Sequence, residues 1–333
     1  MSELAEPCLK NNMIYHEDIP EYVQDIIQTS LFQRLKDVGM NCGNEYTQFE
    51  PFCHCRGVSR YQHSIGVALI VYHFTQDKHQ VIAALLHDIA SPVFAHVIDF
   101  MHHDYLQQVA TENLTEQMIK NNHELQKIFL RYHIDENKVI NYHDYPIADN
   151  DTPQLSADRL EYTLSNALYY GLLKQDEIKN IYHHLHVNET KDEIVFDNLE
   201  VARLFTQTML QCSQYYVCDA NRYCMEYLAR LMRYAIENGI CTYQDLYTTE
   251  TQVIQKLMNH PTTKKTFEDF TQFNQVLVSL SPQKGYFKVQ AKKRYINPKV
   301  YHQRILDIDK KLNKAVQNYL NDDFHRYVKA IIK

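Results

Sequence analysis

The sequence predicts a mostly α-helical protein with a few short strands. Apolar residues recur at helical spacing through most of the chain. Only 7 of the 333 residues are glycine, well below the usual share of roughly 7%, which disfavours a turn-rich β architecture. With 45% hydrophobic residues the chain can bury a substantial core. We expect a core over residues 19–175 and a helical extension with short β-hairpin elements over residues 176–333, with a soft boundary that also allows one continuous domain.

Helices are expected in the N-terminal half wherever apolar periodicity is sustained. Pro20 suits the first turn of the first helix. A loop over residues 43–60 leads into a second helix, whose buried face carries Val67, Ile70, Val71 and Phe74. Residues 81–86 are apolar on every face, which predicts a buried helix that reaches His87 and Asp88.

The remaining chain alternates between polar loops and helical periods. Residues 104–133 are expected to be helical, residues 141–155 form a polar loop, and Ser156 is a plausible N-cap for the helix that follows. Residues 183–196 predict a small β-hairpin with histidines on its flank. Further on we expect helices over residues 198–237, 243–273 and 302–331, and short strands over residues 276–278, 286–289 and 293–296.

His87 and Asp88 stand together after the buried apolar run, and His63 lies 24 positions before His87. A carboxylate without a partner in such surroundings would be strongly unfavourable, and a metal ion is one of the few partners that could offset the cost. Imidazole and carboxylate ligands suit Mn, Fe, Ni or Zn better than Ca. Because the chain has 18 His and 41 Asp plus Glu, the pair alone is weak support, and a hydrogen-bonded core histidine would also explain His87.

Asp158 begins a second polar pattern. Tyr162 and Asn166 follow at i+4 and i+8, so all three share one face of the helix. That face can present a metal ligand and then polar groups to a bound molecule. The alternative is an ordinary capped surface helix, with Asp158 favourable near the N-terminal dipole. Together with His63, His87 and Asp88, Asp158 would supply the fourth ligand.

The context of these residues resembles the HD-domain phosphohydrolases. Arg60-Tyr-Gln-His-Ser-Ile-Gly66, and the run from Leu86-His87-Asp88 through Pro92 to His96, are similar to the branch containing the dNTP triphosphohydrolases. That branch reads Arg-Phe-Glu-His-Ser-Leu-Gly and then Leu-His-Asp-Leu-Gly-His-Gly-Pro-Phe-Ser-His. The resemblance is strong over roughly residues 30–170. It implies an HD-domain helical core and one divalent transition metal ion, Mn, Fe, Ni or Zn with Mg also allowed, held by His63, His87, Asp88 and Asp158.

The resemblance also implies roles for residues around the metal. Arg159 stands where the related enzymes place a Lys on phosphate, and Tyr162 and Asn166 stand where they place a Tyr and an Asp near the sugar. Arg60 lies one helical turn before His63, which favours a phosphate contact over a surface arginine. Residues 40–42 replace the Gln-Leu-Gly with which those enzymes help recognise the sugar, so strict deoxynucleotide specificity does not transfer.

Two histidines of the related catalytic apparatus are absent from this sequence. Ser91 replaces one of them, and Thr111 replaces the His that precedes a Glu, which is kept as Glu112. His96 remains at the position that closes the motif. It could act as a general acid, with Glu112 as the next candidate, although a histidine that packs the turn explains His96 equally well. The metal ligands are therefore complete, whereas the proton-transfer residues differ.

We expect a metal-dependent phosphohydrolase that acts on a nucleotide or on a related phosphoester or phosphoanhydride. The alternative is a non-hydrolysing regulatory module that binds metal and nucleotide through an altered HD site. A structural helical domain with a vestigial site is a third interpretation. Metal analysis separates the third interpretation from the others, and a screen for turnover separates the first two.

Composition limits the partners and the compartment. A net charge of −7 and a pI near 6.2 give no strong nucleic-acid signal. A polar N-terminus and the lack of a run of roughly 18 apolar residues predict a cytoplasmic chain with no membrane segment and with reduced thiols. Cys53-His54-Cys55 has no second pair of Cys or His ligands nearby, so it is expected to be a loop and not a zinc site. The basic segment over residues 284–299 is expected to be a solvated face or an anion contact at a subunit interface, and we expect a homo-oligomer.

Overall fold

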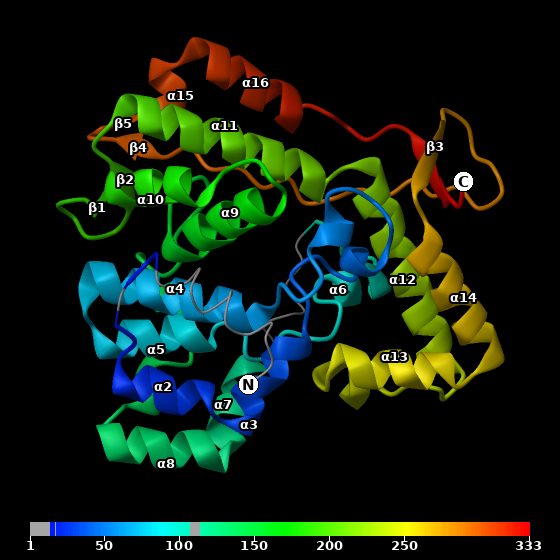
Figure 1. Cartoon of the computed structure of the whole chain (residues 1–333), viewed down its shortest axis with the longest axis horizontal. Coiled ribbons are helices and arrows are strands. Elements are labelled where there is room, and N and C mark those ends of the chain that lie inside the picture. Colours follow the sequence, from blue (N-terminus) through cyan, green and yellow to red (C-terminus); the bar gives the residue numbers. More distant parts are fainter. Residues whose placement is uncertain (1–13, 17, 107–113) are drawn as a thin grey trace.

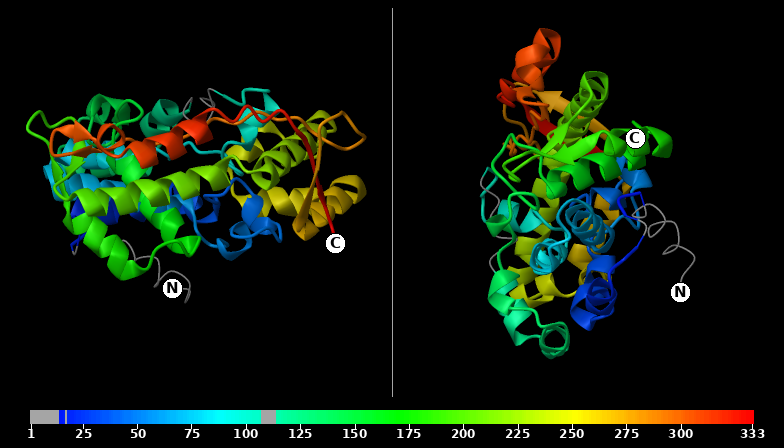
Figure 2. Two further views of the ribbon diagram at one scale, coloured as in Figure 1. Left: turned by 90° about the horizontal axis from the view of Figure 1, so that it is seen from above. Right: turned by 90° about the vertical axis from the view of Figure 1, so that its left-hand side faces the viewer.

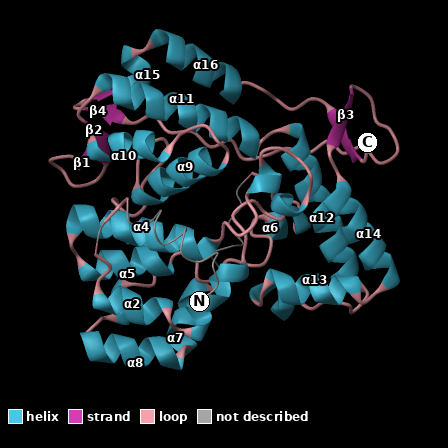
Figure 3. Ribbon diagram, in the orientation of Figure 1, coloured by secondary structure: helices cyan, strands magenta, loops and turns pink. Residues whose placement is uncertain are grey.

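The structure is a computed structural model that describes residues 14–16, 18–106 and 114–333. It confirms a mostly α-helical fold with short strands (Figures 1 and 3). The helices of the N-terminal half are α2 (Glu21–Ile27), α3 (Ser30–Gln33), α4 (Arg60–Thr75), α5 (Lys78–Leu86), α6 (Val97–Met101), α7 (Thr115–Asn121), α8 (His123–Tyr132) and α9 (Ala157–Tyr169). The later ones are α10 (Gln175–His183), α11 (Leu199–Tyr216), α12 (Asp219–Glu237), α13 (Glu250–Met258), α14 (Pro261–Gln272), α15 (Ile305–Ile308) and α16 (Lys310–Leu320). No described helix is both long and apolar enough to cross a membrane.

Helix α4 lies at the centre of the N-terminal half and is buried on almost every face. Ser59 is its N-cap residue, and the amide of Ser59 donates to Gln62 Oε1 at 2.9 Å, as at many helix starts. Helix α5 packs along α4 (Figure 1) and begins after Asp77, whose carboxylate caps its first turn. Because α5 is apolar and buried from residue 81 to its end, it carries His87 and Asp88 into the interior.

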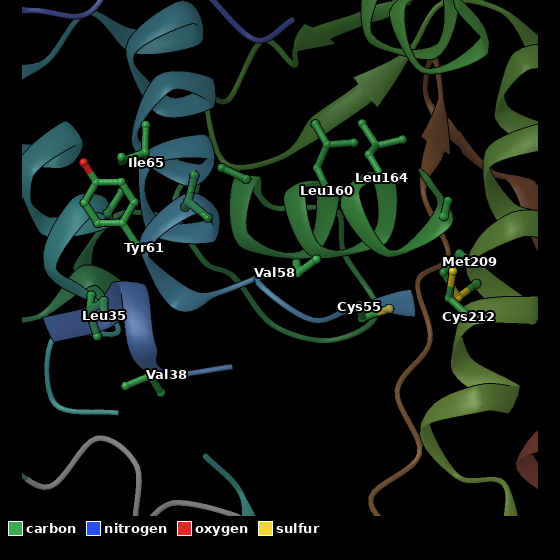
Figure 4. Packing of buried hydrophobic residues seen from close by; sticks show 14 of the residues in the cluster. Leu35, Val38, Cys55, Val58, Tyr61, Ile65, Leu160, Leu164, Met209 and Cys212 are labelled. Carbon is green, nitrogen blue, oxygen red and sulfur yellow. The ribbon is translucent and has the colours of Figure 1, made fainter. Parts of the chain in front are cut away.

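Helix α9 packs against α4 on one side and carries polar groups on another. The hydroxyl of Ser156 accepts a hydrogen bond from the amide of Arg159 at 3.4 Å, so the predicted N-cap is confirmed. Leu160 and Leu164 of α9 lie in the same buried cluster as Ile65 of α4 (Figure 4). These apolar contacts fix how α4 and α9 face each other.

Two small sheets complete the fold. In the first, β1 (Leu185–Val187) and β2 (Ile194–Phe196) are antiparallel, which confirms the predicted hairpin. Strand β2 then pairs in parallel with β4 (Lys299–Val300), which pairs with β5 (Gln303–Arg304). In the second sheet, β3 (Gln275–Ser279) pairs antiparallel with β6 (Tyr327–Ile331). Helix α16 packs along α11 on the outside of the molecule (Figure 2).

Two predictions for the C-terminal part are wrong. The last helix does not run over residues 302–331, because α16 ends at Leu320 and β6 follows. In β6, Val328 and Ala330 are buried and their neighbours are partly exposed, which is the period of a strand. Residues 286–289 and 293–296 do not form strands either, apart from one bridge between Phe287 and Val328. They belong to an extended connection that runs from beside β3 back to β4, orange in Figure 1.

Candidate metal centre

Three helices bring the four predicted ligands together. His63 lies in the first turn of α4, His87 and Asp88 follow the end of α5, and Asp158 lies in the first turn of α9. His63 Nε2 is 3.1 Å from Asp158 Oδ1 and 3.8 Å from Asp88 Oδ2. His87 Nε2 is 3.5 Å from Asp88 Oδ2 and 3.8 Å from Asp158 Oδ1. The two histidines and Asp88 are buried, and Asp158 is partly buried.

These separations suit ligands of a single ion. With metal–ligand bonds of about 2.1 Å, two ligands of one ion lie about 3 Å apart at a right angle and at most about 4.2 Å apart. The four distances, from 3.1 to 3.8 Å, fall within this range. Two imidazole nitrogens and two carboxylate oxygens are donors that Mn, Fe, Ni and Zn accept. His63, His87 and Asp88, whose ligand atoms all lie within 4.8 Å of one another, therefore fit a divalent ion, and Asp158, 3.1 and 3.8 Å from the two histidines, stays the predicted fourth ligand.

Both histidines are oriented by hydrogen bonds at the ring nitrogen that faces away from the cluster. His63 Nδ1 contacts Glu161 Oε2, and His87 Nδ1 lies 2.7 Å from the carbonyl oxygen of Ala84. Each acceptor requires a proton on Nδ1, so the lone pair of each Nε2 is left to face the cluster. This arrangement is typical of histidines that ligate metals.

Glu161 was missed by the sequence analysis, although it lies one turn after Asp158 on α9. It is 1% exposed, and its other carboxylate oxygen accepts from the hydroxyl of Ser165. A Cβ atom at Gly66 of α4 would lie 2.7 Å from Cγ of Glu161, so a glycine is needed where the two helices meet. Two features of the sequence could have indicated this contact: Gly66 lies three positions after His63, and Glu161 lies three positions after Asp158.

Asp88 is held on both of its oxygens. Arg60 Nη1 donates to Oδ2 at 2.7 Å, and the Ser91 hydroxyl donates to Oδ1 at 2.8 Å. Arg34, which directly follows α3, donates to the carbonyl oxygens of Ile89 and Ser91 at 2.8 and 2.9 Å and so fixes the same turn. Ser91 thus stabilises a ligand at the position where the resembled enzymes have a catalytic histidine.

The charges in this cluster depend on one another. Burial lowers the pKa of His63, but Glu161 and Asp158 outweigh burial and raise it to about 10. Burial would raise the pKa of Asp158, yet the hydrogen bond with His63 brings it down to about 2. Arg60 and the two histidines likewise hold the pKa of Asp88 far below its usual range, against the effect of burial. Two ionised carboxylates favour a divalent cation, which would displace the proton from His63.

A cavity with about 950 Å³ of empty space, which includes open solvent, lies beside the cluster. Asp158, Tyr162 and Asn166 line it from successive turns of α9, so the predicted shared face is present. Asn166 Nδ2 donates to the hydroxyl of Tyr216 at 2.8 Å. The rest of the wall combines aromatic rings, amides and basic groups: Asn41, Phe52, Arg60, Phe100, Tyr170, Tyr216, Asn221, Arg222, Lys292 and Arg294, among others. Rings and amides together suit a ligand with an apolar ring system and polar substituents.

His96 lines the same cavity and sits between two charged groups. Its Nδ1 lies 2.9 Å from Asp99 Oδ2, and its Nε2 lies 3.2 Å from Arg294 Nη2. Because an arginine can only donate, Nε2 accepts and the proton is on Nδ1. Burial and the nearby arginines lower the pKa of His96, although Asp99 opposes them, so the neutral ring is favoured. Sequence analysis did not identify either of these partners.

Arg159 makes its contacts in the loop before α9. Arg159 donates to Asn150 Oδ1 at 2.7 Å, contacts Asp149 Oδ1 at 3.1 Å, and does not line the described cavity. Its role as a phosphate contact stays a prediction, and the observed contacts stabilise the loop before α9. Glu112 and Thr111 lie outside the described residues.

A second group of ligand-type side chains lies on the loop before α4. Glu50, Cys53 and His54 are close together there, and His54 Nε2 lies 2.9 Å from Glu50 Oε1. Cys55 is instead buried, with its sulfur near the Pro51 carbonyl, so Cys53-His54-Cys55 does not converge on one point. This agrees with the loop that the sequence predicts.

Comparison with known proteins finds similarity over the part of the chain that holds the predicted ligands. Residues 60–163, which include all four ligands, match the HD domain family. The uncharacterized protein YdhJ of Bacillus subtilis is 28% identical over 253 residues, covering 74% of this chain and 74% of that protein. The metal-dependent phosphohydrolase cns2 of Cordyceps militaris is 26% identical over 205 residues, covering 59% of this chain and 57% of that protein.

Solved structures share the fold. A phosphohydrolase from Bacteroides thetaiotaomicron superposes with a TM-score of 0.65 at 15% identity, covering 95% of this chain and 97% of that one. A hypothetical protein from Aquifex aeolicus gives a TM-score of 0.58 at 17% identity, with 89% of each chain covered. Together with the family match, these findings support the HD superfamily, and the triphosphohydrolase branch stays a prediction from the motifs.

Proposed function

We propose that this protein is a metal-dependent phosphohydrolase that acts on a nucleotide or on a related phosphoester or phosphoanhydride. The observation that supports it most directly is the placement of the His63, His87, Asp88 and Asp158 cluster at a cavity with basic, aromatic and amide walls. The phosphohydrolase named among the relatives is consistent with this proposal.

The chain's own residues would bind and orient the substrate. A divalent ion held by the four ligands supplies Lewis-acid activation of phosphate and of water. Arg60 adds a positive charge beside the ligands, and Tyr162 and Asn166 can contact the sugar or base of a nucleotide. His96 can transfer a proton to a leaving oxygen only after its Nε2, which accepts from Arg294, leaves that arginine and takes up a proton, because the ring proton is on Nδ1.

A non-hydrolysing, nucleotide-sensing module is the second candidate. It is favoured by Ser91, which hydrogen-bonds Asp88 where the resembled enzymes have a histidine, and by the contact between His96 and Arg294. Both features leave metal and phosphate binding intact while they alter proton transfer.

One screen separates the two candidates. The purified protein, loaded in turn with Mn²⁺, Fe²⁺, Ni²⁺, Zn²⁺ or Mg²⁺, is tested for phosphate release from nucleoside mono-, di- and triphosphates and from phosphodiesters, with binding measured in parallel. Hydrolysis that depends on metal, and that Asp158→Asn abolishes, supports the enzyme. Binding without hydrolysis for every compound supports the sensing module.

A further inference from the structure

Strand β3 has a neighbouring strand on only one of its sides. It pairs with β6 in a two-stranded sheet that lies at one end of the molecule, near the end of α14 (Figure 1). The far side of β6 is occupied, because the amide of Phe287 donates to the Val328 carbonyl at 2.9 Å and the amide of Val328 donates to the Phe287 carbonyl at 2.8 Å. Among the described residues, no strand pairs with the other side of β3. This side, here called the β3 edge, is therefore open to a further strand.

The pairing pattern shows which backbone groups of β3 point to this edge. Opposite residues of an antiparallel pair alternate between hydrogen-bonded and non-hydrogen-bonded pairs. Because Val328 exchanges its two backbone bonds with Phe287, it forms a non-hydrogen-bonded pair with Val278, the residue opposite it. Leu277 is then the residue that bonds to β6, and the amides and carbonyls of Val276 and Val278 point outward. Within the described chain, no backbone hydrogen bond joins these outward groups to another segment.

The β3 edge is exposed, apolar and uncharged. Val328 is buried, whereas Val278 opposite it is 53% exposed, and Leu277 and Leu280 are 37% and 87% exposed. Residues 272–283 contain no charged side chain, although 23% of the whole chain is charged. Edge strands that must stay unpaired usually carry a charge, a proline or a bulge. Strand β3 has neither a charge nor a proline, and its register with β6 is unbroken, so it is suited to accept a partner strand.

A second copy of β3 is the partner that fits this edge. In an antiparallel pair of copies related by a twofold axis at Leu277, Val276 of each copy lies opposite Val278 of the other. The outward amides and carbonyls then form hydrogen-bonded pairs, and the two copies of Leu277 meet in a non-hydrogen-bonded pair, where side chains are closest. Apolar groups meet apolar groups at all three positions. The chain has a net charge of −7, yet no like charges meet along this stretch.

We propose that the β3 edge joins two copies of this protein into a dimer, with a twofold axis at Leu277 and a continuous four-stranded sheet in the order β6, β3, β3, β6. Such a contact is isologous, because the same surface is used by both copies. It does not depend on the proposed hydrolysis, since no residue of β3 is among those that line the described cavity. Strands of five residues form a small contact compared with stable interfaces of roughly 1,200–2,000 Å², so the dimer should dissociate in the micromolar range.

Sedimentation equilibrium of the full chain from about 1 to 100 µM tests the proposal. The unmodified chain should shift from monomer to dimer as its concentration rises. Leu277→Lys should stay monomeric, because it brings two ammonium groups together at the axis. Leu130→Lys, which changes a leucine of α8 that is 79% exposed, is the matched control and should dimerise like the unmodified chain. Thermal unfolding confirms that each variant is folded.

A charge-swap experiment then tests the position of the axis. Fluorescently labelled Leu277→Lys should sediment as a dimer after unlabelled Leu277→Glu is added, because opposite charges then face each other. Adding unlabelled Leu277→Lys should leave the labelled chain monomeric.

Three results would overturn the proposal. The first is an unmodified chain that stays monomeric over the whole concentration range. The second is a dimer that Leu277→Lys leaves intact, because another surface would then hold the two copies together. The third is a labelled Leu277→Lys chain that stays monomeric when Leu277→Glu is added, because position 277 would then not face its own copy.

Discussion

Glu161 accepts a hydrogen bond from Nδ1 of His63, and this contact joins α4 and α9, two of the three helices that position the predicted ligands of the candidate metal centre. It orients the imidazole so that Nε2 faces Asp158, 3.1 Å away. Because Glu161 is buried and anionic, it also increases the basicity of the ligand. The geometry of the centre therefore depends on a residue outside the four ligands.

Replacing Glu161 with Gln should weaken the metal centre without unfolding the chain. The amide keeps the size of the side chain but loses the negative charge, and changes in such outer partners typically cost 10–100-fold in metal affinity. Competition with a fluorescent chelator measures the affinity. Glu200→Gln, at an exposed site of α11, is the matched control and should bind metal normally. Equal affinities in the two variants would remove Glu161 from the account.

Gly66→Ala should disturb the same contact from the opposite helix. The added methyl would lie 2.7 Å from Cγ of Glu161, and overpacking of this kind costs about 1–3 kcal/mol, although alanine normally stabilises a helix relative to glycine. Urea unfolding measures the loss. The double variant Gly66→Ala/Glu161→Ala should recover most of the stability while its metal affinity stays low. If the double variant is no more stable than the single one, the close approach of these residues does not limit stability.

His96→Ala should retain metal but lose turnover by roughly 10²–10⁴, if His96 acts as a general acid. The loss should be smallest for substrates with good leaving groups, because such groups need less protonation. Rates measured across a series of leaving groups test this dependence. A rate loss that is the same for every leaving group would instead indicate that His96 positions Arg294. Glu112 would then be the next candidate acid.

A buried carboxyl pair outside the metal centre predicts how stability depends on pH. Burial raises the pKa of Glu250, and the hydrogen bonds that its carboxylate accepts from the amide of Gly39 at 2.8 Å and from the hydroxyl of Tyr46 at 2.7 Å oppose that rise. Burial and the nearby Glu250 raise the pKa of Glu45 from 4.5 to about 8. Between these values Glu45 holds a proton in the folded chain that it has lost in the unfolded chain, so stability should fall as pH rises, and Glu45 alone contributes at most about 1.4 kcal/mol per pH unit.

Urea unfolding from pH 5 to pH 8 measures this slope. Glu45→Gln cannot ionise, so the variant should have a flatter pH profile. The same slope in both proteins would show that another group causes the dependence. Since Met40, Asn41 and Cys42 of the adjoining loop line the cavity, loss of this pair should also alter ligand binding.

Local sequence patterns predicted which residues converge in the candidate metal centre, because motif spacing and helix caps are short-range features. His63, His87, Asp88 and Asp158 converge as expected, and Tyr162 and Asn166 follow along the cavity wall. The partners that orient these residues could not be predicted in this way. Arg294 lies 198 positions from His96, and no periodicity in the chain predicts that contact.

The C-terminal errors have a related cause. Residues 327–331 resemble the end of a helix in isolation, but they pair with β3, so a long-range contact decides their structure. The basic segment over residues 284–299 was expected to contain short strands and to form a solvated face or an anion contact at a subunit interface, whereas Lys292 and Arg294 line a cavity built mainly by earlier helices. Tertiary packing overrides local preference in both segments.

Anomalous diffraction at the absorption edge of a bound metal tests the metal centre most directly. Crystals grown with Mn²⁺ or Zn²⁺ should show a strong peak about 2.0–2.3 Å from Nε2 of His63, Nε2 of His87 and a carboxylate oxygen each of Asp88 and Asp158. No peak at that position, or a peak only beside Glu50, Cys53 and His54, would contradict the assignment of the metal centre and with it the proposed chemistry.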